Sequence, residues 1–296
     1  MTTTNLPPAP PAPPAAPVGG APAPGASPRR TSSRVVATIA IVVGSILLLG
    51  TVFTGVVSII RSATTHTSTV TASAAGLAAI DLDVSAAEVT VEYGEVAEPT
   101  LRVTSGRGDW RFERVGDTLV VSSDRQWWGR WGWGWLRDAD SATLTLPRGV
   151  EGLDADFDVD GGSLTAQGGF GDLGLTLDAG SLRVTGRAET VSTDVNAGSA
   201  RLELGDVTSA TVSVSAGSLE GRLGDTLGNA SPVVPRSLSV DVSAGRVDLT
   251  VPDAEYAITS DVSAGSFSHD LSESSASDNR IGVTVSAGAV ILRSAG

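Results

Sequence analysis

The chain has 296 residues, with 33 acidic residues against 20 basic ones and a formal net charge of −13. It contains no cysteine, which excludes disulfide staples, thiolate metal sites and a lipid-modified N-terminal cysteine. The acidic balance argues against nucleic acid or an anionic membrane surface as a direct ligand. All 20 basic residues are arginine, and the absence of lysine suggests a GC-rich genome.

Residues 1–34 hold ten of the 15 prolines. A segment of this composition buries little apolar surface, so it is expected to be a disordered or polyproline II tail. Such a tail is either a simple tether or a PxxP ligand for a cytosolic domain.

An uncharged stretch follows at 35–60. Its 26 residues would form a helix about 39 Å long, which is enough to cross a hydrocarbon core of about 30 Å. Arg29, Arg30 and Arg34 precede the stretch and only Arg61 follows it closely, so the N-terminus is expected in the cytoplasm and the remainder outside. A cleaved signal peptide is the alternative. Residues 61–79 are interpreted as a flexible stalk.

Short alternating segments then open the domain expected over 80–296. Strands are predicted at Ile80–Tyr93, Thr100–Val103, Phe112–Val115, Thr118–Ser122 and Ser141–Leu146, pairing as hairpins that start the fold.

Between the last two of these strands lie five of the six tryptophans. They are Trp127, Trp128, Trp131, Trp133 and Trp135. One interpretation is an apron packed over the open end or side of the fold. The others are a belt in the membrane interface and a stacking surface for a protein or glycan partner.

From residue 150 onward a pentad of the type Val-Ser-Ala-Gly-Ser recurs, and such self-similarity decides the architecture. Its glycines are Gly162, Gly180, Gly198, Gly217, Gly245, Gly265 and Gly288, with Ala87 in a weaker first copy. An aliphatic residue stands three positions before each of them, and in nearly every copy an apolar residue stands two positions after. The pattern indicates strand, corner, strand.

The corner chemistry follows from the residue types. Glycine permits the positive φ of a sharp corner, and the preceding alanine is small enough for corners to stack. One such unit cannot bury its own apolar face, so copies must stack and share one core. We therefore predict an all-β fold, a right-handed parallel β-solenoid whose last strand is Val290–Leu292. The alternative is an antiparallel sandwich with Ala-Gly hairpins. Loops are expected at 225–236 and 271–280.

No catalytic arrangement is recognisable around the two histidines, His66 and His269, and neither a catalytic residue nor a cofactor is predicted. Asp156, Asp158 and Asp160 imitate the spacing of a calcium loop, but Gln167 stands where a glutamate is needed and no helices flank the loop. These three are weak metal candidates. A second acidic set would line one outer face of the stack, either as a solvated face or as a weak cation site. It comprises Asp83, Asp158, Asp194, Asp241 and Asp261.

The order of apolar segment, short strands, a Leu-Pro-x-Gly-Val turn at Leu146–Val150 and Ala-Gly-Ser rungs resembles the bacterial adhesin-type family called the toastrack domain. The resemblance covers about Ile80–Leu292. It implies a β-solenoid on the outer face of the envelope, with no catalytic residues to carry over.

Three functions are compatible with these observations. The first is a non-enzymatic, single-pass envelope protein that displays a rigid β-solenoid to a partner or to another copy of itself. The second is an envelope-stress sensor that signals through the proline-rich tail. The third is a glycan-cleaving β-helix enzyme, which would need a pair of catalytic carboxylates that the sequence does not reveal.

Overall fold

The computed structural model describes residues 58–60, 66–105, 109–124, 140–224 and 232–295. Within these residues no helix has the length and apolar character needed to span a bilayer. The proline-rich tail, residues 35–57 of the expected membrane helix and the tryptophan segment lie outside the described residues.

The described residues form strands joined by short turns and one 3₁₀ helix at Arg148–Val150, so the all-β prediction is confirmed for them. The strands are β1 (Ser58–Ile60), β2 (His66–Thr71), β3 (Ala79–Gly94), β4 (Thr100–Ser105), β5 (Asp109–Val115), β6 (Thr118–Asp124), β7 (Ser141–Pro147), β8 (Leu153–Leu177), β9 (Ser181–Gly205), β10 (Ser209–Leu223), β11 (Ser237–Pro252), β12 (Glu255–His269), β13 (Ser272–Glu273) and β14 (Arg280–Ala295).

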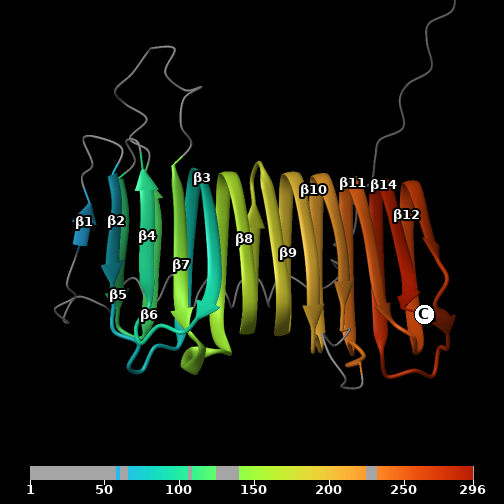
Figure 1. The fold of residues 1–296 in the computed structure, drawn as a ribbon. Coiled ribbons are helices and arrows are strands. Elements are labelled where there is room, and N and C mark those ends of the chain that lie inside the picture. The colour runs from blue at the N-terminus through green and yellow to red at the C-terminus, as the bar shows by residue number, and fades with distance from the viewer. Residues whose placement is uncertain (1–57, 61–65, 106–108, 125–139, 225–231, 296) are drawn as a thin grey trace, which may run out of the picture. The chain divides into compact units, whose positions relative to one another are not determined.

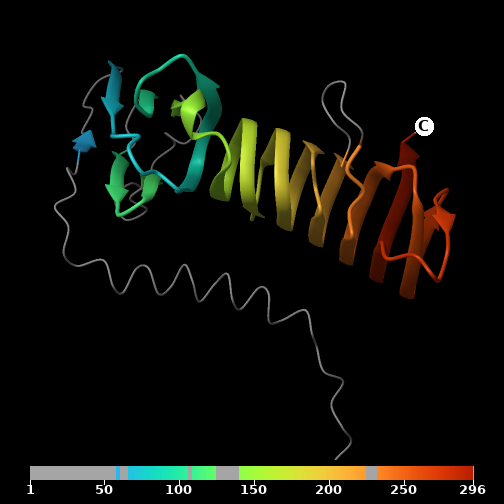
Figure 2. The ribbon, with the colours of Figure 1, turned by 90° about the horizontal axis from the view of Figure 1, so that it is seen from below.

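From β3 onward the chain coils, and successive turns pair in parallel (Figures 1 and 2). Leu177 of β8 lies beside Val195 of β9, which lies beside Val214 of β10. Equivalent pentad residues therefore occupy straight columns along the stack. The parallel stack predicted from the repeat is present and the antiparallel sandwich is excluded for these strands, whereas the right-handed sense stays a prediction.

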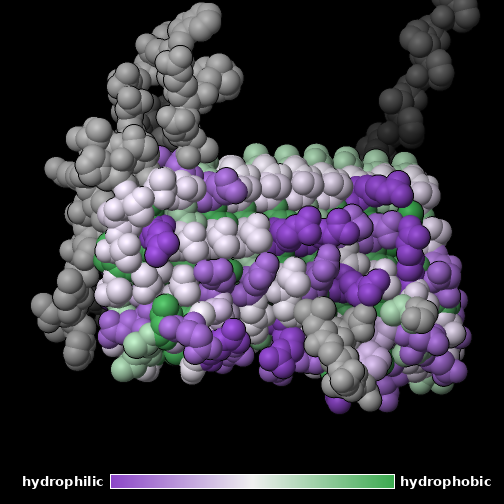
Figure 3. All heavy atoms as spheres, in the orientation of Figure 1, coloured by the Kyte–Doolittle hydropathy of each residue, from purple (hydrophilic) through white to green (hydrophobic). Residues whose placement is uncertain are grey.

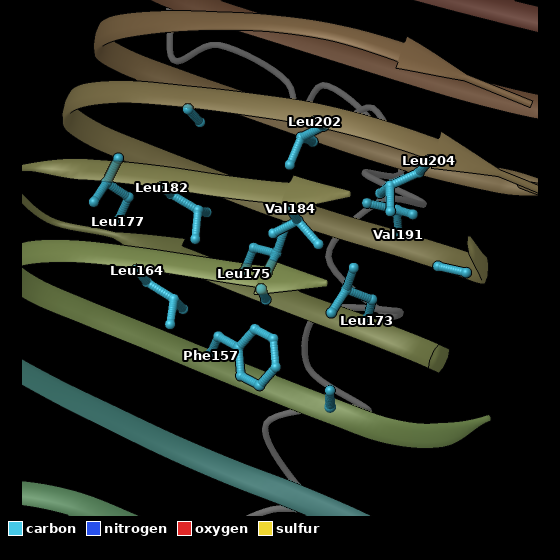
Figure 4. Packing of buried hydrophobic residues seen from close by; sticks show 14 of the residues in the cluster. Phe157, Leu164, Leu173, Leu175, Leu177, Leu182, Val184, Val191, Leu202 and Leu204 are labelled. Atoms are coloured by element: carbon cyan, nitrogen blue, oxygen red, sulfur yellow. The ribbon is translucent and has the colours of Figure 1, made fainter. Parts of the chain in front are cut away.

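The core lies between the two walls of each coil. Side chains before the corner, such as Phe157 and Leu175, face side chains after it, such as Leu164 and Val184 (Figure 4). All four are at most 2% exposed. Burying an aliphatic side chain contributes about 1.5–3 kcal/mol, and the alternation of apolar and polar residues repeats this contribution in every turn.

The first turns of the stack are built from separate strands. β3 pairs in parallel with β6 through its first half and with β7 through its second half. β5 runs antiparallel to β6, and β4 runs antiparallel to both β7 and β2. The β5–β6 pair is a hairpin as expected, but β4 joins the opposite wall.

The ordered domain starts earlier than the sequence suggested. Ser58–Ile60, expected as the end of a helix, form β1 and pair with β5. His66–Thr71, expected as flexible stalk, form β2 and pair with β4. In β2 the half-buried Ser68 and Val70 alternate with exposed threonines, so the run has the period of a strand. Small polar residues disguised that pattern.

The far end of the stack departs from sequence order. The order of neighbouring strands there is β11-β14-β12-β13, so the C-terminal strand β14 is inserted between β11 and β12 (Figure 1). Val285 of β14 lies beside Val242 on one side and Val262 on the other. Val290–Leu292 lies in β14, the last strand along the chain as predicted, but in space the last full turn of the stack is β12.

The corner residues line up along one edge, as predicted. Gly198 lies beside Gly217, and Gly288 lies between Gly245 and Gly265. Positive φ was expected at all seven glycines, but it is found at Gly162, Gly180, Gly198, Gly265 and Gly288. Gly217 and Gly245 adopt no positive φ and are needed for another reason. A Cβ on Gly217 would lie 2.8 Å from the carbonyl oxygen of Gly198, and one on Gly245 would lie 2.6 Å from that of Gly217.

Candidate functional site

The tryptophan segment lies outside the described residues, but its flanks are described. β6 ends at Asp124 and β7 begins at Ser141. Because β6 and β7 pair with the two halves of β3, residues 125–139 fall in the chain where later turns carry their Ala-Gly corner. The roles considered for these tryptophans stay predictions.

The acidic column forms on the outer face of the wall before the corner. Asp83 lies beside Asp158, and Asp158 and Asp194 flank Thr176 across the next two turns. Further along, Asp241 and Asp261 are separated by Thr284, because β14 intervenes. Hydroxyl residues thus interrupt the like charges at every step except the first. In Figure 3, which views the stack from the side shown in Figure 1, residues of similar hydropathy also run in rows across the strands.

The only directly adjacent pair in that column, Asp83 and Asp158, belongs to a denser cluster. Partial burial and the neighbouring carboxylates of Asp160, Asp83, Asp178 and Asp156 raise the pKa of Asp158 to about 6. Burial also raises the pKa of Asp156. This cluster is therefore a place where negative charge is held at a cost in stability.

Polar contacts compensate part of this repulsion. The Ser85 hydroxyl donates to Oδ2 of Asp160 at 3.2 Å, and the Asn196 amide donates to Oδ1 of Asp178 at 2.7 Å. Both contacts join one turn to the next, so the acidic face also helps to hold the stack together.

The three metal candidates, Asp156, Asp158 and Asp160, all lie within β8. An extended strand places alternate carboxylates in a row along one face, whereas a calcium loop must wrap its oxygens around the ion. The loop that their spacing imitates is not formed. Within the described residues no group of three or more acidic or histidine side chains is arranged to hold a metal ion.

The open end at β12 is a surface that sequence reasoning missed. Val262 is 40% exposed and is the one large apolar side chain classed as exposed among the described residues. Phe267 is half-buried, and its ring centroid lies 5.3 Å from that of His269. A signal was available, because Ser260 and His269 occupy positions that face the core in other turns.

A second missed feature is an arginine clamp near the start of the domain. The half-buried Arg114 donates from Nη1 to the carbonyl oxygens of Ser73 and Ala75 at 3.1 and 2.6 Å, and from Nη2 to that of Gly76 at 3.0 Å. Its Nε donates to the carbonyl of Gly116 at 2.8 Å. The guanidinium thereby fixes the chain between β2 and β3 against the β5–β6 turn.

Comparison with known proteins identifies likeness to solved structures only. No family model matches the chain, and no curated protein matches it. The structure of a proposed cell adhesion protein of Clostridium sporogenes is similar to this chain, with 11% identity and a TM-score of 0.36. The similarity covers 78% of this chain and 99% of that one. A proposed adhesin of Bacteroides fragilis is similar with 10% identity and a TM-score of 0.42, over 77% of this chain and 97% of that one.

Proposed function

We propose that this chain is a non-enzymatic envelope protein of the adhesin-type β-solenoid class. A single membrane helix within residues 35–57 anchors it with the N-terminus in the cytoplasm. The stacked domain stands outside the membrane and presents its surface to a partner or to another copy of the chain.

The observation that carries the proposal is the parallel pairing of each turn with the next from β3 to β12, with a register shift around Ser85 in the first of these pairs. Every turn is tied to the next by a backbone ladder and by shared core residues, so the stack is a stiff rod. Eight such turns are separated by seven spacings of about 4.8 Å, so they span roughly 34 Å. Stiff repeat stacks of this kind serve as extended binding surfaces.

The position of β1 adds a geometric argument. β1 begins at Ser58, within the last three residues of the apolar stretch, so an anchor that ends at residue 57 leaves no long stalk. Along the order of paired strands, β1 lies at one end of the stacked domain and β12 lies near the other end, which we call the tip.

Orientation is tested with the full chain in intact cells of a bacterial host. One epitope tag is placed after Gly296 and another before Thr2. We expect antibody to reach the C-terminal tag without permeabilisation and the N-terminal tag only after it. The reverse pattern would refute the proposed placement.

Partner binding is tested by a photoreactive amino acid at Trp131 in the same cells. We expect discrete cross-linked protein or glycan adducts after illumination. Adducts confined to lipid or to the chain itself would show that the tryptophan segment is not the docking surface. A matched probe at Ser239, an exposed residue on the outer face of β11, measures background capture.

A further inference from the structure

The outer edge of β12 is an unpaired strand edge at the end of the stack. β14 pairs with one side of β12 from Ala257 to His269. On the other side, β13 pairs only with Glu255 and Tyr256. Among the described residues no strand covers the rest of that edge, which Figure 1 shows at the right-hand end of the stack.

This edge lacks the features that usually protect an exposed strand. Such features are proline, lysine, an inward-pointing charge or a bulge. The segment Ala257–Val262 has the sequence Ala-Ile-Thr-Ser-Asp-Val and contains one charge, on Asp261. Asp261 lies in the outward-facing column with Asp241, so it does not block the edge. The end of the core is exposed there at Val262.

We propose that this edge pairs with the same edge of a second copy, antiparallel and around a two-fold axis through Ser260. The proposal rests on the proposed function, because it names the partner at the tip of the displayed rod. The proposed partner at this edge is a second copy of the chain and no other macromolecule.

The sequence of the edge is self-complementary in this register. With Ser260 opposite Ser260, Ile258 of one copy lies opposite Val262 of the other, and both belong to the inward-facing set. Thr259 lies opposite Asp261, so each carboxylate meets a hydroxyl and the two carboxylates avoid each other. Cross-strand pairs of these kinds each contribute a few tenths to about 1 kcal/mol, whereas directly opposed like charges destabilise.

The register also agrees with the length of the free edge. β13 occupies the edge beside Glu255 and Tyr256, so free pairing starts at Ala257. In the partner the straight segment ends at the Ala264-Gly265 corner. Ala257 of one copy meets Ser263 of the other, and seven residues of each strand pair before the partner turns away from β13.

The register is tested by disulfide formation in the full-length chain, purified in detergent, which contains no cysteine of its own. Chains carrying Ile258→Cys are mixed with differently tagged chains carrying Val262→Cys and oxidised. Directly opposed residues in antiparallel strands are about 4.5–5.5 Å apart, whereas two copies of Ile258 would be about 13 Å apart. We expect the mixed dimer to exceed either homodimer, because a disulfide requires Cα atoms within about 7 Å.

The association itself is tested by sedimentation of the full chain over a range of concentrations. Ser260→Arg places two guanidinium groups against each other on the axis, and we expect at least about tenfold weaker dimerisation. Ser239→Arg, an equivalent change on the exposed outer face of β11, is the control and should leave the dimer intact. Both variants should melt within a few degrees of the parent, because both sites are exposed.

A monomer at every concentration, a dimer indifferent to Ser260→Arg, or disulfides that favour the two homodimers would each overturn the proposal. So would a tip that binds only a different protein. These outcomes leave the tag-accessibility result untouched, so a failure of self-pairing is distinguishable from a failure of the envelope assignment.

Discussion

Substitution of Gly217 tests whether the corners must stack as closely as the structure shows. Gly217 has no positive φ, so an added side chain meets no intrinsic backbone strain. The obstacle is the neighbouring turn, because a Cβ there would lie 2.8 Å from the Gly198 carbonyl oxygen and 2.9 Å from Cγ1 of Val195. An ordinary carbon–oxygen contact is several tenths of an ångström longer, and the oxygen belongs to the backbone, so the two turns must separate.

Overpacking of this kind costs about 1–3 kcal/mol, and we expect Gly217→Ala to fall in that range. Gly217→Val adds two methyl groups at the same place and should exceed it. For a domain of this size each kcal/mol lowers Tm by about 2–4 °C, so the alanine variant should melt about 2–12 °C lower. The assay is thermal unfolding followed by circular dichroism. Gly282→Ala in β14 is the control, because a Cβ there would meet nothing within 4 Å. Equal melting of Gly217→Ala and Gly282→Ala would refute the close-stacking argument.

Three further predictions concern the acidic face, the arginine clamp and the strand order. The folded-state pKa of Asp158 is about 6, above its ordinary value of 3.8, so the folded state binds the proton more tightly. The stability that protonated Asp158 contributes is complete below pH 3.8 and is lost as the pH rises through about 6. After allowance for solvent screening, the free energy of unfolding falls by about 1–2 kcal/mol. Urea unfolding from pH 4 to 7 should show it, and Asp158→Asn should flatten it. Arg114→Lys cannot reproduce the forked contacts of the guanidinium, so it should destabilise by about 1–3 kcal/mol and speed amide exchange between β2 and β3; unchanged exchange would contradict the clamp. Cysteines replacing Asp241 and Thr284 should form a disulfide on oxidation, because neighbouring strands lie about 4.8 Å apart. Cysteines replacing Asp241 and Asp261 should not, since two turns exceed the reach of a disulfide, and the opposite result would restore the sequential order.

The columns of the stack could be predicted from the sequence because each turn repeats a similar five-residue pattern. The aliphatic position of the pentad, such as Val195 and Val214, and its glycine fall into register as soon as the copies are aligned. Alignment of the copies does not explain why glycine is required at each corner. Gly198 has positive φ and Gly217 does not, and only the distance to the neighbouring turn explains the second.

The candidate site was less predictable, since it depends on which turns are neighbours. The five-residue acidic column was apparent from spacing, but the density of charge around Asp158 arises because Asp160, Asp178 and Asp156 surround it together with Asp83 of the neighbouring turn. The Arg114 clamp binds carbonyl oxygens, and every residue has one, so no side-chain pattern marks its partners. β1 was missed because Ser58–Ile60 belong to the apolar stretch predicted as a helix, and β2 was missed because serine and threonine obscure a strand period that aliphatic residues would have shown.

The insertion of β14 before β12 follows from which residues each strand would place in the core. In the position adjoining β12, the inward residues of β14 include Val283 and Leu292, which are 2% and 0% exposed. In the observed order Ser260 and His269, which lie beside them, are exposed at the end of the stack. Exchanging the two strands would bury this serine and histidine and expose the valine and leucine.

The magnitudes favour the observed order. Loss of burial for two aliphatic side chains costs about 1.5–3 kcal/mol each, and burying unpaired polar groups costs about 1–3 kcal/mol each. Against this stands the closure of the connecting segment 270–279, whose entropy grows only as the logarithm of its length and costs about 2 kcal/mol for ten residues. The polar residues of β12 therefore make it the better end strand, and the same residues leave an edge on which Ser260 can meet its counterpart in a second chain.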